Sequence, residues 1–248
     1  MILDFESKKE INIVEEIMRY FLAILLVVLI GAMSATTIYD VQYTTNAGDG
    51  TYPSTMSGQE VTVEGVVTAT GMQGDKYFIS EPQGGAWRGL FIFDFDTMPQ
   101  VGDLVSATGT VSEYYGVTEL SYVTATVISG GNPLPNTTVV TTGSLSNAAV
   151  AEQYEGVYVA VSRATVSSDT ATNGFNMFGL NDGTGECMVD DDMDVDYNPS
   201  VGEMMDIIGI CHYSYDEYKI LPRTAADLLP YGTSNSKKSW GRIKSIYR

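Results

Sequence analysis

The chain has 248 residues and a formal net charge of -18, from 31 acidic and 13 basic residues, and it is rich in glycine (25) and tyrosine (16). Its length allows two modest domains or one large one, and its composition favours strands joined by tight turns over helices. Residues 36 to 236 hold 26 of the acidic residues but only five of the basic ones. This balance opposes nucleic-acid binding, which depends on cations that neutralise phosphates.

Residues 1–35 are predicted to be an export signal. Tyr20 to Ala35 form an uncharged apolar run, YFLAILLVVLIGAMSA, which is short for a membrane span and ends in small residues suited to cleavage after Ser34 or Ala35. Met18 is a plausible true start, because Arg19 then gives a compact positive region before the run. We expect a secreted or extracytoplasmic protein, in the periplasm or at the cell surface, without a membrane segment after cleavage. An uncleaved signal anchor is the alternative.

The next segments are a leader and a first barrel. Residues 36–58 contain one short strand-like stretch, IYDVQY, followed by a polar loop. Residues 59–132 begin with QEVTVEGVVTATG, in which apolar and polar residues alternate as in a strand with one buried face. KYFIS and GLFIFDF follow as a hairpin around a glycine-rich turn. A long strand with a central glycine and a returning strand complete five strands.

An internal match at an offset of one hundred residues predicts that a second barrel occupies residues 153–231. The segment from Pro99, PQVGDLVSATGTVSEYYGVTEL, aligns without gaps on PSVGEMMDIIGICHYSYDEYKI, from Pro199. Five strands per copy with a glycine kink in the fourth suit a small closed Greek-key barrel. We therefore predict an all-β protein with two tandem five-stranded OB-like barrels.

The remaining segments are a linker and a tail. Residues 133–152 form a Pro/Gly/Thr linker with a short helix that starts near Ser144 or Ser146. Residues 232–248 form a flexible spacer and a basic tail, in which Trp240, Ile243 and Ile246 recur every third position. The tail can be a disordered terminus, a helix docked on the acidic body or a recognition element for a partner.

Cys187 and Cys211 are the only cysteines. Export permits a disulfide between them, and two buried free thiols are the alternative, because the sequence does not give the Cα separation that a bridge requires.

An acidic run, VDDDMDVDYNPSVGE, is the candidate metal site. Its candidate ligands are Asp192, Asp194, Asp196 and Glu203, whose spacing is that of oxygen ligands in a calcium loop. The loop lacks the required glycine, and Glu203 aligns with Asp103 at the start of a strand. Ca²⁺ is thus the one cofactor that the sequence suggests, none is required, and a solvated acidic loop is the alternative.

Aromatic side chains are the other candidate surface, because OB barrels bind ligands across strands two and three and the neighbouring loops. The candidate ligand-binding residues are Tyr77, Trp87, Tyr114, Tyr115, Tyr213 and Tyr215. Such rings can stack on bases or sugars. The alternative is barrel core, which we expect for Phe78, Phe91 and Phe93.

Together, these motifs resemble the OB-fold modules of secreted bacterial proteins, including those that accompany extracellular nucleases of the endonuclease/exonuclease/phosphatase type. The resemblance spans Ile38 to Leu229 and rests on IYDVQYTT, GQEVTVEGVVTATG, YFISEPQGGAWRGLFIFD, NDGTGECMVDD and YKILPR. It implies OB-type barrels in an extracytoplasmic setting. Nuclease activity does not follow from it, because the catalytic domain of those proteins has no counterpart in this sequence.

No catalytic pattern is found in the sequence. His212 is the sole histidine, and no serine or cysteine triad, H-E-x-x-H motif or P-loop is present. We expect a non-catalytic binding or accessory module for an extracellular protein or polysaccharide. The alternatives are a nucleic-acid-binding accessory of a secreted nuclease, which the charge disfavours, and a structural surface or matrix component assembled through the tail. The oligomeric state is left open.

Overall fold

A computed structural model describes residues 18–19 and 35–231 of the chain. The predicted export signal lies almost entirely outside the described residues, as does the tail with Trp240, Ile243 and Ile246. Met18 and Arg19 are helical and exposed. They belong to one compact unit, and the residues from Thr36 onward belong to another. Within the described ranges, no helix combines the length and the apolarity needed to cross a membrane.

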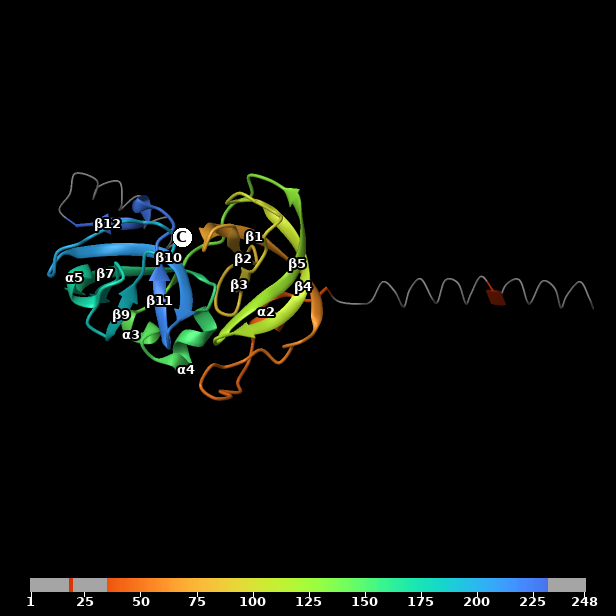
Figure 1. Ribbon diagram of the computed structural model, residues 1–248, viewed down its shortest axis with the longest axis horizontal. Helices are drawn as coiled ribbons and strands as arrows, with labels where there is room; N and C mark the ends of the chain where they lie inside the picture. The colour runs from red at the N-terminus through yellow and green to blue at the C-terminus, as the bar shows by residue number, and fades with distance from the viewer. Residues whose placement is uncertain (1–17, 20–34, 232–248) are drawn as a thin grey trace, which may run out of the picture. The chain divides into compact units, whose positions relative to one another are not determined.

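The first barrel is a closed five-stranded sheet in the order β1-β2-β3-β5-β4 (Figure 1, orange to yellow-green). Its strands are β1 (Glu60–Met72), β2 (Lys76–Ser80), β3 (Gly89–Ile92), β4 (Leu104–Tyr114) and β5 (Val117–Ser129). β1 closes the barrel because its first half pairs with β4 and its second half pairs with β2. β3 and β5 are the one parallel pair.

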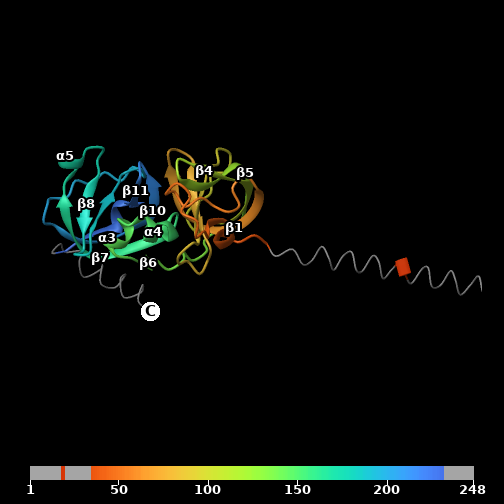
Figure 2. The ribbon, with the colours of Figure 1, turned by 90° about the horizontal axis from the view of Figure 1, so that it is seen from below.

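The second barrel repeats this topology (Figure 1, green to blue). Its strands are β7 (Tyr158–Ser168), β8 (Phe178–Asn181), β9 (Glu186–Val189), β10 (Met204–Ser214) and β11 (Glu217–Leu221). The β10–β7 pairing closes it, and β9 and β11 are the parallel pair. Two short edge strands extend the sheet. β6 (Thr138–Val139) lies beside β7 (Figure 2), and β12 (Leu228–Pro230) lies beside β10 (Figure 1).

Residues one hundred positions apart occupy matching places. Gly102 donates its amide to the Val67 carbonyl and Gly202 to the Val166 carbonyl, each at 2.9 Å. Gly109 and Gly209 lie where an added Cβ would meet the carbonyl of the returning strand, at 2.9 and 2.5 Å. The prediction of an all-β fold with two five-stranded OB-like barrels is therefore confirmed.

Two local predictions were wrong. The strand-like stretch of the leader is a helix, α2 (Ile38–Gln42), because Thr37 and Asp40 form a capping box that satisfies its first amides. The single linker helix near Ser144 or Ser146 is instead a pair, α3 (Thr142–Leu145) and α4 (Ala148–Ala151), followed by the 3-10 turn η1 (Glu152–Tyr154). Two other short helices are α5 (Thr170–Asn173) and η2 (Ala225–Asp227).

The hydrophobic core has two clusters. One lies inside the first barrel and contains Tyr77, Ile79 and Leu90. The larger fills the second barrel and also includes Phe78 and Phe91 of the first. Because successive residues of a strand point to opposite faces, Tyr77 and Phe78 lie on different sides of β2. Both sides are buried, which means that the two barrels share apolar packing.

Candidate binding site

The expected ligand face of the first barrel, over β2 and β3, is covered by the second barrel. Phe78 and Phe91 contact His212 of β10, with ring centroids 5.7 and 5.8 Å away. At the edge of this contact Gly89 faces Gly156, and a Cβ on Gly156 would lie 2.8 Å from the carbonyl carbon of Gly89. The two backbones touch because neither residue has a side chain.

Polar contacts fix the same interface. The Thr118 amide of β5 donates to Glu155 Oε1 at 2.9 Å, and the Trp87 amide donates to the Gln153 carbonyl at 2.6 Å. Arg223, which follows β11, donates to the Thr68 carbonyl at 3.1 Å and stacks on Tyr158, 4.1 Å from its ring centroid. In this structure the β2–β3 face of the first barrel is therefore not accessible to a ligand.

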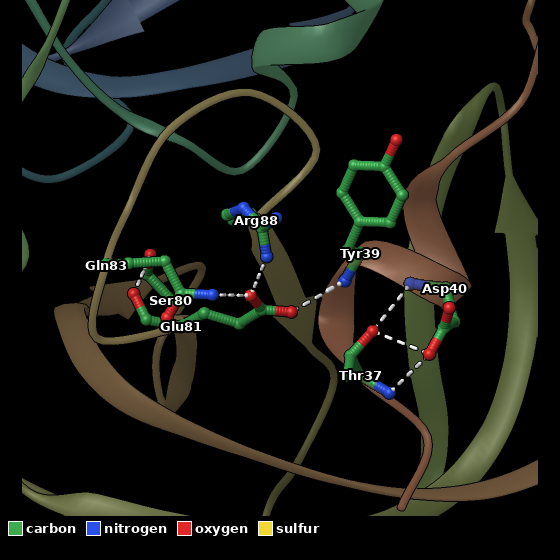
Figure 3. Close-up of polar contacts among 7 residues, drawn as sticks. All are labelled: Thr37, Tyr39, Asp40, Ser80, Glu81, Gln83 and Arg88. Carbon is green, nitrogen blue, oxygen red and sulfur yellow. Dashed lines mark hydrogen bonds and ion pairs between the residues drawn. The ribbon is translucent and has the colours of Figure 1, made fainter. Parts of the chain in front are cut away.

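The leader covers a further edge of the first barrel (Figure 3). The Tyr39 amide at the start of α2 donates to Glu81 Oε1 at 2.9 Å. Arg88 forms an ion pair with the other oxygen of Glu81, and its guanidinium lies 4.9 Å from the centroid of the Tyr39 ring. Gln42 donates to the Gly89 carbonyl at 2.8 Å. The leader thus packs against the first barrel as part of the folded body.

The second barrel has a pocket of about 200 Å³ beside its third strand, β9. Its walls are β9, the β10–β11 turn with the start of β11, and the linker helices α3 and α4, which pack beside β9 and β11 (Figure 1). The lining residues are Leu145, Ser146, Ala148, Glu186, Cys187, Met188, Asp216, Glu217 and Tyr218. Strand three and the loop between strands four and five, two of the OB ligand-binding elements, therefore meet at this pocket.

The wall formed by α3 is held in place by side chains of the β8–β9 turn. Thr142 donates its amide and its hydroxyl to Asp182, at 3.2 and 2.7 Å. The Gly143 amide donates to Thr184 Oγ1 at 2.8 Å. Since Gly143 would place a Cβ only 2.4 Å from the Thr184 carbonyl, glycine is required for this close approach. The linker is therefore a structural part of the pocket.

The pocket is acidic. Glu186, Asp216 and Glu217 line it, and its lining includes no lysine or arginine. Glu186 contacts the Ser167 hydroxyl and Asp216 accepts a hydrogen bond from Tyr213 at 3.2 Å, whereas Glu217 is an exposed residue at the start of β11. Carboxylates are acceptors only, so a ligand here must supply hydrogen-bond donors or positive charge.

Of the six predicted aromatic residues, two are buried, one is half-buried and three are exposed. Tyr77 is fully buried inside the first barrel, donating to Asp94 at 3.1 Å, and Tyr213 is buried against Gly116. Their assignment to a ligand surface was wrong, because they point into the packed interior. Trp87 is half-buried and makes a T-shaped contact with Tyr43, with the ring centroids 5.6 Å apart.

The other three aromatic residues are exposed. Tyr114 and Tyr115 lie at the β4–β5 turn, and Tyr215 lies at the matching β10–β11 turn with 92% of its surface exposed. Tyr215 adjoins Asp216 of the pocket, and the Lys219 ammonium lies 5.4 Å from its ring centroid. Of the predicted aromatics, Tyr215 is therefore the one beside the pocket. Phe78 and Phe91 are buried as expected, but beneath the second barrel.

The predicted calcium ligands are not gathered into a site. Glu203 accepts from the Tyr197 hydroxyl at 2.9 Å and from the Ser200 amide at 3.3 Å, as Asp103 accepts from Gln100 in the first barrel. Asp192, Asp194 and Asp196 are exposed. Partial desolvation, with the neighbouring charge of Asp190, raises the pKa of Asp192. In the described part of the chain no three His, Cys, Asp or Glu side chains are placed to hold a metal ion.

The two cysteines are free and buried. Burial raises the pKa of both thiols, and the nearby charges of Asp182 and Glu155 add to the effect at Cys187 and Cys211 respectively. The structure thus corresponds to the alternative of two buried free thiols.

His212 packs against both Phe78 and Phe91, whose rings also contact each other. Burial, with a smaller effect from Lys219, lowers its pKa to about 4, so the ring is neutral near pH 7. The single histidine is therefore part of the apolar packing, and the described residues form two OB-like barrels.

Comparison with known proteins gives few matches. No family model matches the chain, and no curated protein is similar to it. A solved structure described as "Crystal structure of p204 HINb domain" is 14% identical, covers 67% of this chain and 92% of its own, and has a TM-score of 0.31. A second, "Structure of murine DNA binding protein bound with ds DNA", is 12% identical, covers 64% and 92%, and has a TM-score of 0.30. Similarity at this level carries no information about function.

Proposed function

We propose that this chain is a non-catalytic binding module that engages a protein or polysaccharide partner at the pocket of its second barrel. One observation carries the proposal: the β2–β3 face of the first barrel is covered, while a pocket of about 200 Å³ lies beside β9, the third strand of the second barrel. Pockets with a few convergent polar groups are the usual position of ligands. The first barrel then supports the second.

The acidic lining favours a protein partner. Glu186, Asp216 and Glu217 can accept from an ammonium or guanidinium group, and Leu145 and Met188 can contact the aliphatic stem of a lysine or arginine. Sugar hydroxyls are weaker donors for the same carboxylates. The same carboxylates would repel phosphate groups, so nucleic acid is a less favoured partner than either protein or polysaccharide.

We also propose that the module acts outside the cytoplasm. The support is the apolar run from Tyr20 to Ala35 and the acidic composition of the segment that follows it.

The test is titration of the full chain with a hexalysine peptide, with cellohexaose and with a single-stranded oligonucleotide. We expect the peptide to bind, with affinity falling as salt rises. Glu217→Gln should weaken it about tenfold, since a hydrogen bond to a charged group contributes about 1.5–3 kcal/mol. Glu64→Gln, at an exposed position of β1, is the matched control.

Equal peptide affinity for the Glu217 variant and the native chain would refute the site. Binding of cellohexaose alone would leave a polysaccharide module, and tight, salt-sensitive retention of the oligonucleotide would revive the nucleic-acid alternative.

A further inference from the structure

Four glutamates meet where the barrels join. Glu113 lies near the end of β4, Glu119 lies in β5, Glu152 starts η1 and Glu155 follows it. Thr118 links two of them, because its hydroxyl donates to Glu113 Oε1 and its amide donates to Glu155 Oε1, both at 2.9 Å. The Tyr218 hydroxyl of β11 contacts Glu152. This glutamate cluster thus contains side chains from both barrels and from the linker.

The glutamate cluster lacks the partners that ionised carboxylates need. Glu119, Glu152 and Glu155 are each at most 5% exposed. Three buried oxygens of the cluster have no hydrogen-bond partner, namely Oε2 of Glu113, Glu119 and Glu155, and the neighbouring Gln42 Oε1 has none either. In the described ranges the lysines and arginines that form ion pairs do so with Glu81, Asp190 and Asp227 instead. A carboxyl group that is buried without a cation is favoured in its neutral form.

The titration of the glutamate cluster agrees with this geometry. Burial raises the pKa of Glu119 and of Glu152 to about 7, with the charge of Glu113 adding to both. Burial also raises the pKa of Glu113 and, further, that of Glu155, where Glu152 adds to the shift. The other titratable groups that face the cluster, Cys211, Tyr213 and Tyr218, also have raised pKa values and stay neutral.

We propose that the junction between the barrels is an acid-stabilised lock, closed while the glutamate cluster is protonated and loosened when it ionises. Loosening would uncover Phe78 and Phe91 on the β2–β3 face of the first barrel. This inference goes beyond the proposed function, because it concerns the face that the pocket does not use.

The sign of the effect follows from proton linkage. The carboxyl of Glu119 has a pKa of 4.5 when exposed and of about 7 in the closed structure. Between these two pH values the carboxyl is protonated in the closed state and ionised in the open state, so rising pH favours opening. The lock is therefore most stable below about pH 4.5 and weakens as the pH rises through about 7.

The experiment is hydrogen exchange of the full chain at pH 5 and pH 8. The reporters are the amides of Thr118 and Trp87, which donate across the junction, and the references are those of Val67 and Val166, which donate within their own barrels. The references correct for the intrinsic pH dependence of exchange. We expect reporter protection relative to the references to fall at least about tenfold from pH 5 to pH 8.

In the Glu119→Gln/Glu155→Gln variant, whose amides imitate neutral carboxyls, this fall should become smaller, because only Glu113 and Glu152 of the cluster still titrate, whereas Glu64→Gln should behave as the native chain. If the double variant misfolds, Glu152→Gln alone should reduce the fall. Constant reporter protection across the pH range, or a fall that the variants leave unchanged, would overturn the proposal.

Discussion

Replacing Gly89 by alanine should open the junction by steric means alone. The φ angle of Gly89 does not require glycine, so the substitution adds only a methyl group. An ideal Cβ at this position would lie under 3.0 Å from three backbone atoms of Gly156 and Val157. A backbone cannot rotate away as the end of a side chain can, which means that β3 and the start of the second barrel must separate.

The expected loss can be bounded. Inserting a methyl group into a packed core destabilises a protein by about 1–3 kcal/mol, and a clash with backbone atoms belongs at the upper end. For a chain of this size, each kcal/mol lowers the melting temperature by about 2–4 °C. The loss should be concentrated at the junction, because Trp87, two residues before Gly89, donates its amide to the linker at Gln153.

The assay combines thermal unfolding with hydrogen exchange. Gly89→Ala should melt earlier, and the amides of Trp87 and Thr118 should lose protection while Val67 and Val166 keep theirs. Gly130→Ala is the control, since its added Cβ would meet only the Asp103 side chain, at 3.0 Å. If Gly89→Ala has the same melting temperature as the native chain and both junction amides stay protected, the barrels do not pack as described.

Two further predictions concern buried groups of the second barrel. Lys219, 3% exposed, forms an ion pair with Asp190 at 3.1 Å; Lys219→Met should lower the free energy of unfolding in urea by about 3–5 kcal/mol, because it leaves a buried charge unpaired. Adding Asp190→Asn should recover much of that loss, and a single variant as stable as the double one would contradict the ion pair. Cys187 and Cys211 should resist a neutral thiol reagent until the protein is denatured, since both are buried thiols with raised pKa values. Rapid native labelling of either thiol would disprove their burial.

The barrel fold could be predicted from the sequence because its determinants are local and repeated. The alternation in QEVTVEG gives β1 its buried face, and the matched glycines at 109 and 209 mark the places where the fourth strands approach the fifth. Tyr115 and Tyr215 could be placed in exposed turns for the same reason. The secondary structure of the leader could not be predicted in this way, because the apolar residues of IYDVQY fit the period of a strand as well as that of a helix. The capping residues Thr37 and Asp40 favour the helix.

The site was harder to predict because it depends on contacts between distant segments. Tyr77 and Phe78 are adjacent and both buried, and the strand pattern does not say which one faces the barrel interior. Glu152 and Glu155 read as surface residues in EQYEG, and no local signal shows that Thr118 and Tyr218 cover them. The pocket requires α3 to pack beside β9. Residues 133–152, which contain α3, were predicted only as a linker between the barrels, so the sequence did not indicate this contact.

The two barrels share a topology but differ in the side chains that they present beside matching strands. Beside β2 and β3 the first barrel presents aromatic rings, which are stabilised by burial against β10. Beside β9 and β11, which match β3 and β5, the second barrel presents carboxylates, whose burial without partners would be unfavourable. An apolar face can thus become an internal junction, while an acidic surface is favoured to stay in contact with solvent. The glutamate cluster is the exception to this rule, since it is acidic and yet buried at the junction, and for that reason it is the place where protonation should decide whether the barrels stay together.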